Sequence, residues 1–260
     1  MNIIYELNPP KIFYDSTINI KLLDQEIEKF LNRVQSINEF TNFIHVTDSV
    51  LGIPRISSIH GATLIRENIK NTKINLSCSV RTRDRNINSL IQFATQSISM
   101  NINDLLFIMG DKPQINSNAF AKGYLSKPTE VITILSGFGF NRFINLNLSV
   151  PNKISDINKF TDKTNANPHA MVTQSINSLQ EVKDLKNLLE SHPIKLIPCV
   201  MIPSKKNLLA AKMIGLDWNE YENNIIEFIS EIGKLADSVL ITSPNNFNEG
   251  LATLKKFNNH

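Results

Sequence analysis

Cysteine and glycine are both scarce in this chain of 260 residues. Its two cysteines, Cys78 and Cys199, each lie inside an apolar run, which predicts two buried, reduced thiols rather than a disulfide framework. Among the nine glycines, the stretch Gly137-Phe138-Gly139 lacks the third glycine of a dinucleotide-binding loop, and no Walker A sequence is present. The sequence therefore argues against a Rossmann or P-loop nucleotide enzyme.

Metal-binding, membrane and nucleic-acid patterns are also missing. The five histidines have no histidine partner at i, i+4 spacing and no cysteine partner of the zinc type, so we expect no metal site. The 27 basic and 24 acidic residues are spread along the chain without the basic block typical of nucleic-acid binding. No apolar run approaches the roughly 20 residues of a membrane helix, and an acid and two prolines stand where a signal peptide needs an apolar stretch. We expect a cytoplasmic protein with no membrane segment and no nucleic-acid partner.

Short apolar runs rich in β-forming residues recur about every 30 residues, and helical periodicity fills the intervals between them. The eight runs are Ile3–Glu6, Phe43–Thr47, Ile74–Val80, Leu105–Met109, Phe143–Val150, Ala170–Thr173, Leu196–Met201 and Ser238–Ile241. Eight strand–helix units in a chain of this length fit a closed barrel better than a doubly wound sheet, which usually has fewer strands. The sequence predicts an α/β fold, a single (β/α)8 TIM-type barrel over residues 1–260.

Helix boundaries can be placed at several points. Asn86 precedes an apolar periodic segment and is expected to cap its helix, and Ser178 is expected to do the same for the helix that begins at Leu179. An extra helix is expected from 220 to 235, before the last strand. No proline- or glycine-rich linker divides the chain.

Glu6 ends the first apolar run and is followed by Pro9 and Pro10, which prevent both further strand pairing and the start of a helix. In a barrel of this type the chemistry lies on the loops that follow the strands. Glu6 is therefore a candidate active-site acid. The alternative is a solvated glutamate on an N-terminal strand.

Three other strand ends carry candidate groups. Gly110 would let the backbone approach a ligand while Asp111 accepts hydrogen bonds from it, although the same residues fit an ordinary turn. Gln174 could both donate to and accept from a heterocycle, or it could cap the next helix. The run 81–86 holds three arginines that could bind phosphate or carboxylate, or could form a surface lattice of ion pairs.

Taken in order, these segments resemble the methylenetetrahydrofolate reductase family. The matching stretches are Tyr5-Glu6-Leu7-Asn8-Pro9-Pro10-Lys11, Val46-Thr47-Asp48, Gly52-Ile53-Pro54-Arg55-Ile56-Ser57, Thr82-Arg83-Asp84-Arg85-Asn86, Phe107-Ile108-Met109-Gly110-Asp111-Lys112-Pro113 and Met171-Val172-Thr173-Gln174. The similarity extends to about the seventh strand. It implies a barrel that holds FAD, takes electrons from NAD(P)H or another donor, and reduces a 5,10-methylene-tetrahydropterin to the 5-methyl form.

The resemblance also implies roles for individual residues. Glu6 matches the general acid, and Gln174 matches the glutamine that binds the pterin. Asp111 matches an aspartate that contacts both pterin and flavin, with Gly110 beside it in the cofactor-binding loop. Thr47 falls near a flavin-contacting threonine, and Lys163 matches a lysine near the FAD phosphates. A reduced folate or another tetrahydropterin is the implied small-molecule partner.

The chain departs from the family pattern at four places. Ser79 replaces a histidine, Met109 replaces an arginine, and the segments 149–153 and 243–246 lack the family's His-Pro pair and aromatic residue. Most of these positions contact flavin in the family. Two alternatives therefore stay open: a non-catalytic or partner-dependent folate- or pterin-binding homologue that has lost flavin, and a pterin-dependent methyltransferase barrel. The protein is expected to act as a homo-oligomer or as a partner subunit.

Overall fold

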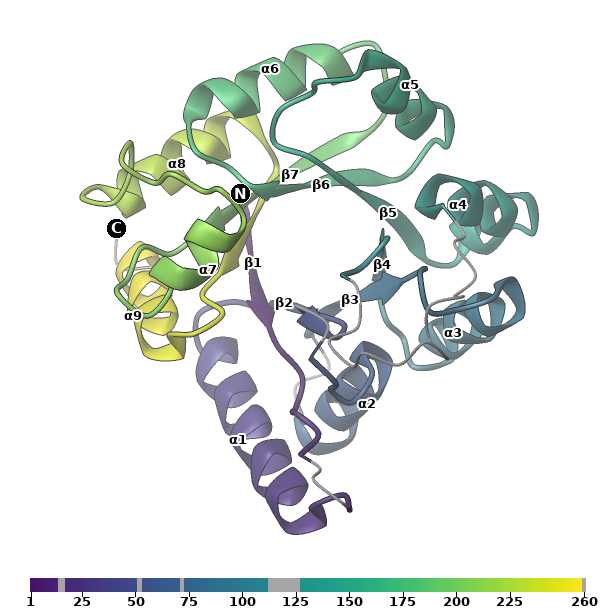
Figure 1. The fold of residues 1–260 in the computed structure, drawn as a ribbon, viewed down its shortest axis with the longest axis vertical. Coiled ribbons are helices and arrows are strands. Elements are labelled where there is room, and N and C mark those ends of the chain that lie inside the picture. Colours follow the sequence, from purple (N-terminus) through teal and green to yellow (C-terminus); the bar gives the residue numbers. More distant parts are fainter. Residues whose placement is uncertain (14–16, 51–52, 71–72, 112–126, 259–260) are drawn as a thin grey trace.

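Eight parallel strands close into one barrel in chain order, with β8 hydrogen-bonded back to β1 (Figure 1). The structure is a computed structural model that describes residues 1–13, 17–50, 53–70, 73–111 and 127–258. The strands are β1 (Asn2–Leu7), β2 (Phe43–Val46), β3 (Asn75–Arg81), β4 (Asp104–Ile108), β5 (Asn145–Val150), β6 (Ala170–Ser175), β7 (Lys195–Met201) and β8 (Ser238–Thr242). The predicted (β/α)8 barrel is confirmed.

The helices form a ring around the outside of the barrel (Figure 1). They are α1 (Ile20–Asn38), α2 (Ser58–Asn68), α3 (Ile87–Ser99), α4 (Pro128–Gly137), the 3-10 turn η3 (Phe140–Arg142), α5 (Ile157–Asn165), α6 (Leu179–Leu189), α7 (Leu208–Met213), α8 (Ile225–Leu235) and α9 (Phe247–Asn258). In the part of the chain that the structure describes, none of them has the length and hydropathy needed to cross a membrane.

Local sequence sets the ends of two helices as expected. Asn86 Oδ1 accepts a hydrogen bond from the Ser89 backbone at 2.9 Å, and Ser178 Oγ accepts one from the Glu181 backbone at 3.4 Å. Each bond satisfies one of the first amide groups of a helix, which have no partner within the helix. Both predicted N-caps are confirmed.

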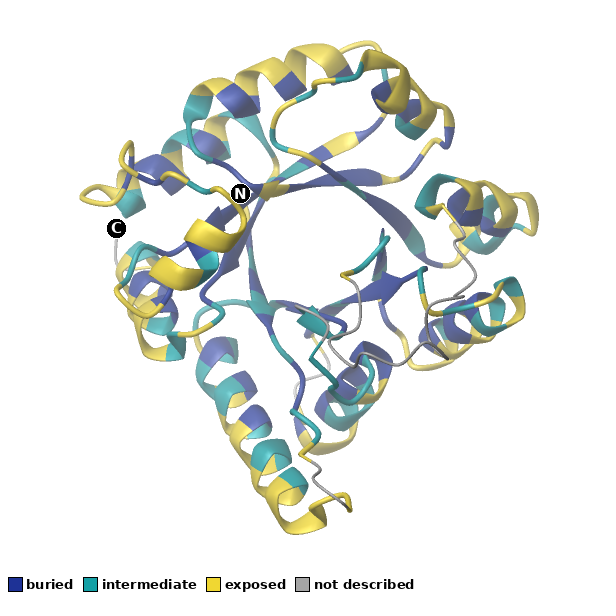
Figure 2. Ribbon diagram, viewed as in Figure 1, coloured by how far each residue is buried: buried dark blue, intermediate teal, exposed yellow. Residues whose placement is uncertain are grey.

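The main core lies between the barrel and the helix ring. Figure 2 shows buried residues along the strands and on the inner faces of the helices, with exposed residues on the outer faces. In α1 the buried side chains are Phe30, Val34 and Ile37, which recur at the three- to four-residue spacing of one helix face. Cys78 is buried with a free thiol, and so is Cys199, as the sequence predicts.

A second, smaller apolar cluster fills the middle of the barrel. It comprises Leu106, Val172, Cys199 and Leu240, whose side chains come from four different strands. Three of these residues, Leu106, Val172 and Leu240, line both a cavity at the carboxyl ends of the strands and a smaller one at the amino ends. The cluster therefore forms a plug between the two cavities.

The lower cavity, at the amino ends of the strands, measures about 180 Å³ and is lined in part by His45, Ser77 and Asp104. Burial lowers the pKa of His45 to about 4, so its ring is neutral near physiological pH. The two ring nitrogens lie 2.8 Å from the hydroxyls of Ser77 and Ser79. His45 therefore joins β2 to β3 inside the barrel through its two serine partners.

Candidate active site

The upper cavity lies at the carboxyl ends of the strands and measures about 710 Å³. Seven of the strands contribute to its wall, and the residues directly after β2 complete it. Residues of the β1–α1 loop, α1 and the loop after α7 extend it. Among the residues singled out from the sequence, it is lined by Glu6, Thr47, Gly110, Asp111 and Gln174. A cavity of this size at this end of a TIM-type barrel is where a small ligand is expected to bind.

Glu6 faces the upper cavity from the end of β1. The hydroxyl of Thr242, at the end of the neighbouring strand β8, donates a hydrogen bond to Glu6 Oε1 at 2.6 Å. Burial raises the pKa of Glu6, and the bond from Thr242 offsets part of that rise. In the described part of the chain, no basic side chain lies within ion-pair distance of this carboxyl. Glu6 is therefore a carboxyl group whose uncharged form is favoured.

Thr47 and Asn8 form a polar pair beside Glu6. The buried Thr47 hydroxyl donates to Asn8 Oδ1 at 2.7 Å, and the Thr47 amide donates to the Leu7 carbonyl at 3.1 Å. These bonds hold the end of β2 against the loop after β1. Thr47 therefore lies in the cavity wall with its hydroxyl already engaged.

Gln174 reaches the cavity because of an irregularity in β6. The pairing of β6 with β7 shifts register between Val172 and Ser175. At this point the Cys199 amide donates to the Thr173 hydroxyl at 2.9 Å, so a side chain takes the place of a backbone acceptor. Thr173 is buried while Gln174 is exposed at the cavity mouth. β-bulges commonly redirect a side chain next to a functional site, and this one places an amide at the mouth.

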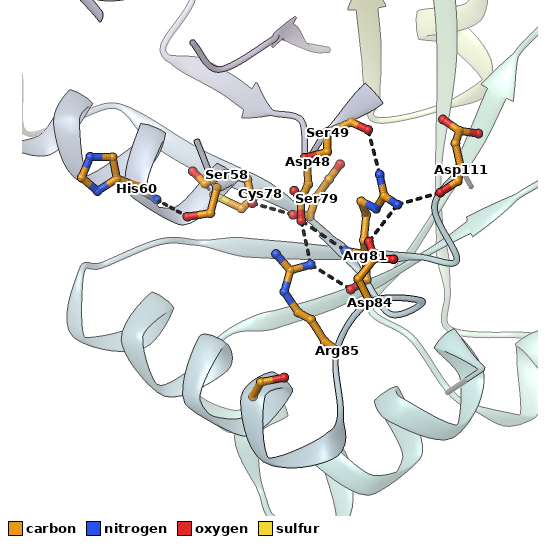
Figure 3. A network of polar contacts seen from close by, with 12 residues as sticks. Asp48, Ser49, Ser58, His60, Cys78, Ser79, Arg81, Asp84, Arg85 and Asp111 are labelled. Atoms are coloured by element: carbon orange, nitrogen blue, oxygen red, sulfur yellow. Dashed lines mark hydrogen bonds and ion pairs between the residues drawn. The ribbon is translucent and has the colours of Figure 1, made fainter. Parts of the chain in front are cut away.

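Arg81 joins three loops at the opposite side of the mouth (Figure 3). Its Nη1 donates to the Ser49 carbonyl at 2.8 Å, and its Nη2 donates to the Asp111 carbonyl at 2.6 Å. The same Nη2 lies 2.7 Å from the Asp84 carboxylate. Arg81 is only 3% exposed, so these bonds are largely shielded from water. Its guanidinium is committed to holding the loops after β2, β3 and β4 together.

Arg85 completes this network. Its Nη1 lies 2.8 Å from the buried Asp48 carboxylate and also donates to the Arg81 carbonyl at 2.8 Å. The guanidinium lies over the Phe93 ring, with 5.2 Å between its central carbon and the ring centroid. Of the two interpretations of the arginine-rich run, the structure supports internal ion pairing rather than an open anion site.

Gly110 and Asp111 owe their conformation to this network. Gly110 has a φ of +83°, and a Cβ placed there would lie 2.7 Å from Arg81 Nε. Arg83 Nε donates to the Gly110 carbonyl at 3.0 Å. Glycine is therefore required here by the packing of Arg81, without any ligand. Figure 3 shows the Asp111 carboxylate directed away from Arg81.

Lys163 does not line the upper cavity. It lies on α5 and donates from Nζ to the Ser149 carbonyl at 2.6 Å, and burial lowers its pKa. The ammonium group is thus used to join α5 to the end of β5, and the structure does not bring it together with the other predicted site residues. Gly52, Lys112 and Pro113, which belong to the matching stretches, lie outside the described residues.

Sequence reasoning missed two residues of the site. Thr242 directly follows the predicted last strand, Ser238–Ile241, and was not singled out from the sequence. Residues at the ends of strands are nevertheless where the chemistry of such barrels lies. Arg55 was noted only as part of a matching stretch, yet it lines the cavity and its guanidinium is partly buried. Its position opposite Pro9 depends on an isolated bridge between Lys11 and Arg55, which local sequence does not reveal.

No protein-family model and no curated protein matches this chain. Solved structures do resemble it. A chain of the tryptophan synthase α2β2 complex from the hyperthermophile Pyrococcus furiosus has 10% sequence identity and a TM-score of 0.55, with 99% of this chain and 95% of that chain covered. A protein from Aquifex aeolicus VF5 has 11% identity and a TM-score of 0.57, covering 99% and 89%. At such identities the likeness shows the shared barrel fold.

These comparisons correct the functional expectation. The similar structures include two tryptophan synthase complexes rather than folate reductases. The expected methylenetetrahydrofolate reductase-like oxidoreductase is therefore wrong. Two of the features that suggested it have another physical explanation, because Gly110 and the arginine-rich run belong to the Arg81 network. What the chain shares with known proteins is the (β/α)8 barrel.

Proposed function

We propose that this protein is a barrel enzyme that carries out acid–base chemistry without redox change on a small ligand in the upper cavity, with Glu6 as the proton donor. The observation that carries the proposal is the bond of Glu6 Oε1 with the Thr242 hydroxyl, inside a cavity of about 710 Å³. Burial raises the pKa of this carboxyl group, which favours the protonated form that a general acid requires.

The geometry supports a defined role for each oxygen of Glu6. Oε1 is occupied by Thr242, so the proton would be carried on Oε2. Transfer of that proton to a ligand nitrogen or oxygen would leave a carboxylate that Thr242 still stabilises through its hydrogen bond. Thr242 would thus orient the acid and favour its charged form after the transfer.

The ligand would be a polar heterocycle or a molecule of similar hydrogen-bonding character. Asn8 and Gln174 place two amide groups on the cavity wall, and amides can both donate to and accept from ring nitrogens and oxygens. A reduced folate or another tetrahydropterin fits this description and is the first ligand to test. FAD and NAD(P)H were implied by the reductase resemblance alone, and we propose no step through either.

A second candidate function is a partner-dependent ligand-binding subunit. The short helix α7 exposes apolar side chains, with Leu209 at 69% and Met213 at 60% exposure. The adjoining Ile214 is 53% exposed and also lines the upper cavity. A partner that covered these side chains would also cover part of the cavity mouth. In this case ligand would bind, but Glu6 would not be needed for turnover.

Infrared difference spectroscopy tests the protonation of Glu6 without a known substrate. A protonated carboxylic acid has a carbonyl band that a carboxylate lacks, and Glu6→Gln should remove such a band from the spectrum at neutral pH. Asp104→Asn is the matched control, because burial also raises the pKa of Asp104 in the lower cavity. If the spectrum at neutral pH contains no band that depends on Glu6, this carboxyl is ionised and the proposal fails.

Ligand screening then separates the two candidate functions. Wild-type protein and Glu6→Gln would be titrated with tetrahydrofolate and with a simple pterin, using calorimetry to measure affinity. An enzyme should keep the affinity and lose turnover by roughly 10²–10⁴-fold in the variant, the usual cost of losing a general acid. A binding subunit should show the same affinity in both proteins and no turnover in either.

A further inference from the structure

One wall of the upper cavity is basic. Lys11, Arg33 and Arg55 line it, together with Lys29, whose ammonium lies 3.1 Å from the Glu26 carboxylate. These residues come from the β1–α1 loop, from α1 and from the segment before α2. The wall therefore carries more positive than negative charge.

Arg55 is the most deeply placed of these cations. Its Nη1 donates to the Pro9 carbonyl at 2.6 Å, which fixes the guanidinium against the rigid Pro9-Pro10 segment. Its Nε is buried without a hydrogen-bond partner. Among the described residues, no carboxylate lies within ion-pair distance of Arg55. Burial lowers its pKa, and the nearby Glu26 and Arg33 act in opposite directions.

A partly buried guanidinium without an anionic partner is unfavourable unless something else supplies the charge. Nη1 is occupied by Pro9 and Nε is buried, so a ligand would meet this guanidinium at the part that lines the cavity. A guanidinium suits a carboxylate or phosphate because its N–H donors and fixed positive charge match the oxygens of these groups. The chemistry of Arg55 therefore calls for an oxyanion.

The loops that bind phosphate in many barrels are hydrogen-bonded to each other in this one. In many barrels the loops after β7 and β8 hold phosphate with free backbone amides. In this chain the buried Asn207 donates to the Ile202 carbonyl at 2.8 Å and to the Ser243 hydroxyl at 2.9 Å. Asn207 Oδ1 also accepts the Asn245 amide at 3.0 Å. These groups are used to join the two loops, which leaves the Arg55 wall as the better anion site.

We propose that Arg55, with Lys11 and Arg33 on the same wall, binds an oxyanion of the ligand whose other end reaches Glu6. This rests on the proposed function, since both groups would hold one molecule in one cavity. Arg55 is the residue that determines specificity for an anionic ligand, through a carboxylate or a phosphate group. Lys11 and Arg33 add charge without the same fixed geometry.

The test is calorimetric titration with inorganic phosphate and, separately, with succinate, which distinguishes the two oxyanions. Arg55→Met should weaken binding by roughly tenfold to a hundredfold, the cost of losing a hydrogen bond to a charged group. Arg55→Lys keeps the charge but not the planar guanidinium, so its affinity should fall between those of the wild type and Arg55→Met. Arg142→Met is the matched control, because Arg142 is exposed on η3 and does not line the cavity.

Three results would overturn the proposal: saturable binding of neither anion, equal losses in Arg55→Met and Arg142→Met, or unchanged affinity in folded Arg55→Met. Circular dichroism checks that each variant is folded, and Arg55→Lys provides the answer if Arg55→Met is not. Failure of the anion site therefore appears in the Arg55 variants, whereas failure of the acid appears in the infrared spectrum and the turnover of Glu6→Gln.

Discussion

Arg81 and Arg55 lie at the same barrel mouth, but their partners differ. Within the described ranges, Nε lacks a hydrogen-bond partner in both. The other nitrogens of Arg81 contact two loop carbonyls and the Asp84 carboxylate, whereas among the same residues Arg55 contacts the Pro9 carbonyl and no carboxylate. A guanidinium whose anionic partner is another residue of the protein has a structural role. A guanidinium without such a partner marks a place where a ligand can provide the anion.

The same contrast separates two carboxyl groups of the upper cavity. Asp48 is 4% exposed and lies 2.8 Å from Arg85 Nη1, so its charge is balanced within the protein. Glu6 has a hydroxyl partner and, among the residues that the structure describes, no cation within ion-pair distance, and burial raises its pKa. The cavity thus has a satisfied side around β2–β4 and an unsatisfied side around β1, and the chemistry is expected on the unsatisfied side.

The largest expected loss of stability comes from replacing Arg81, the arginine whose charge is balanced within the protein. Arg81→Met should lower the free energy of unfolding by about 3–5 kcal/mol, because it leaves buried carbonyls and a carboxylate without their partner. Arg55→Met should change it by only about 1 kcal/mol in either direction, since one hydrogen bond is lost and one unpaired charge is removed. Urea denaturation of both variants measures the difference. Equal losses would show that Arg55 is as structural as Arg81.

A smaller loss of stability is expected when a side chain is added at Gly110, next to Arg81. Gly110→Ala combines a φ of +83° with a Cβ 2.7 Å from Arg81 Nε, and each strained feature of this kind costs about 1–3 kcal/mol. Gly139→Ala is the matched control, because its φ is +81° but the nearest atoms to its Cβ lie 3.9 Å away. The excess loss of stability in Gly110→Ala measures the contact with Arg81. If the two variants lose the same amount, the loop can move and Arg81 does not fix it.

Local patterns predicted the barrel because each strand and cap depends on neighbouring residues. Asn86 and Ser178 cap their helices through bonds to residues three positions further on, which sequence alone can indicate. The satisfied side depends on carbonyls of Ser49 and Asp111, far from Arg81 in the chain. Gly110 was predicted to admit a ligand and is instead required by Arg81, because sequence does not show which distant side chain packs there.

The pH dependence of stability should reveal Glu6, the carboxyl group of the upper cavity whose pKa is raised by burial. The pKa of Glu6 is higher in the folded than in the unfolded protein, so its contribution to stability is present below the unfolded pKa and is lost as pH rises through the folded pKa. Glu6→Gln cannot ionise and should lack this loss. Unfolding free energies of both proteins, measured from about pH 4 to neutral pH, should therefore shift in favour of the variant as the pH rises. Parallel curves would mean that Glu6 ionises as freely when folded as when unfolded.

The smallest effect on stability is expected from replacing Tyr5. This substitution tests whether a buried polar group that makes no hydrogen bond must belong to the ligand site. Tyr5 is 1% exposed, and its hydroxyl has no hydrogen-bond partner in the described part of the chain, but it packs against Gly250 of α9 and does not line the upper cavity. Tyr5→Phe removes a buried polar atom that makes no bond, so stability should stay the same or rise by about 1 kcal/mol. Anion affinity in the variant should equal that of wild type, because the hydroxyl faces the helix ring. A loss of anion binding would place Tyr5 in the ligand's surroundings and extend the unsatisfied side from the cavity to the space behind β1.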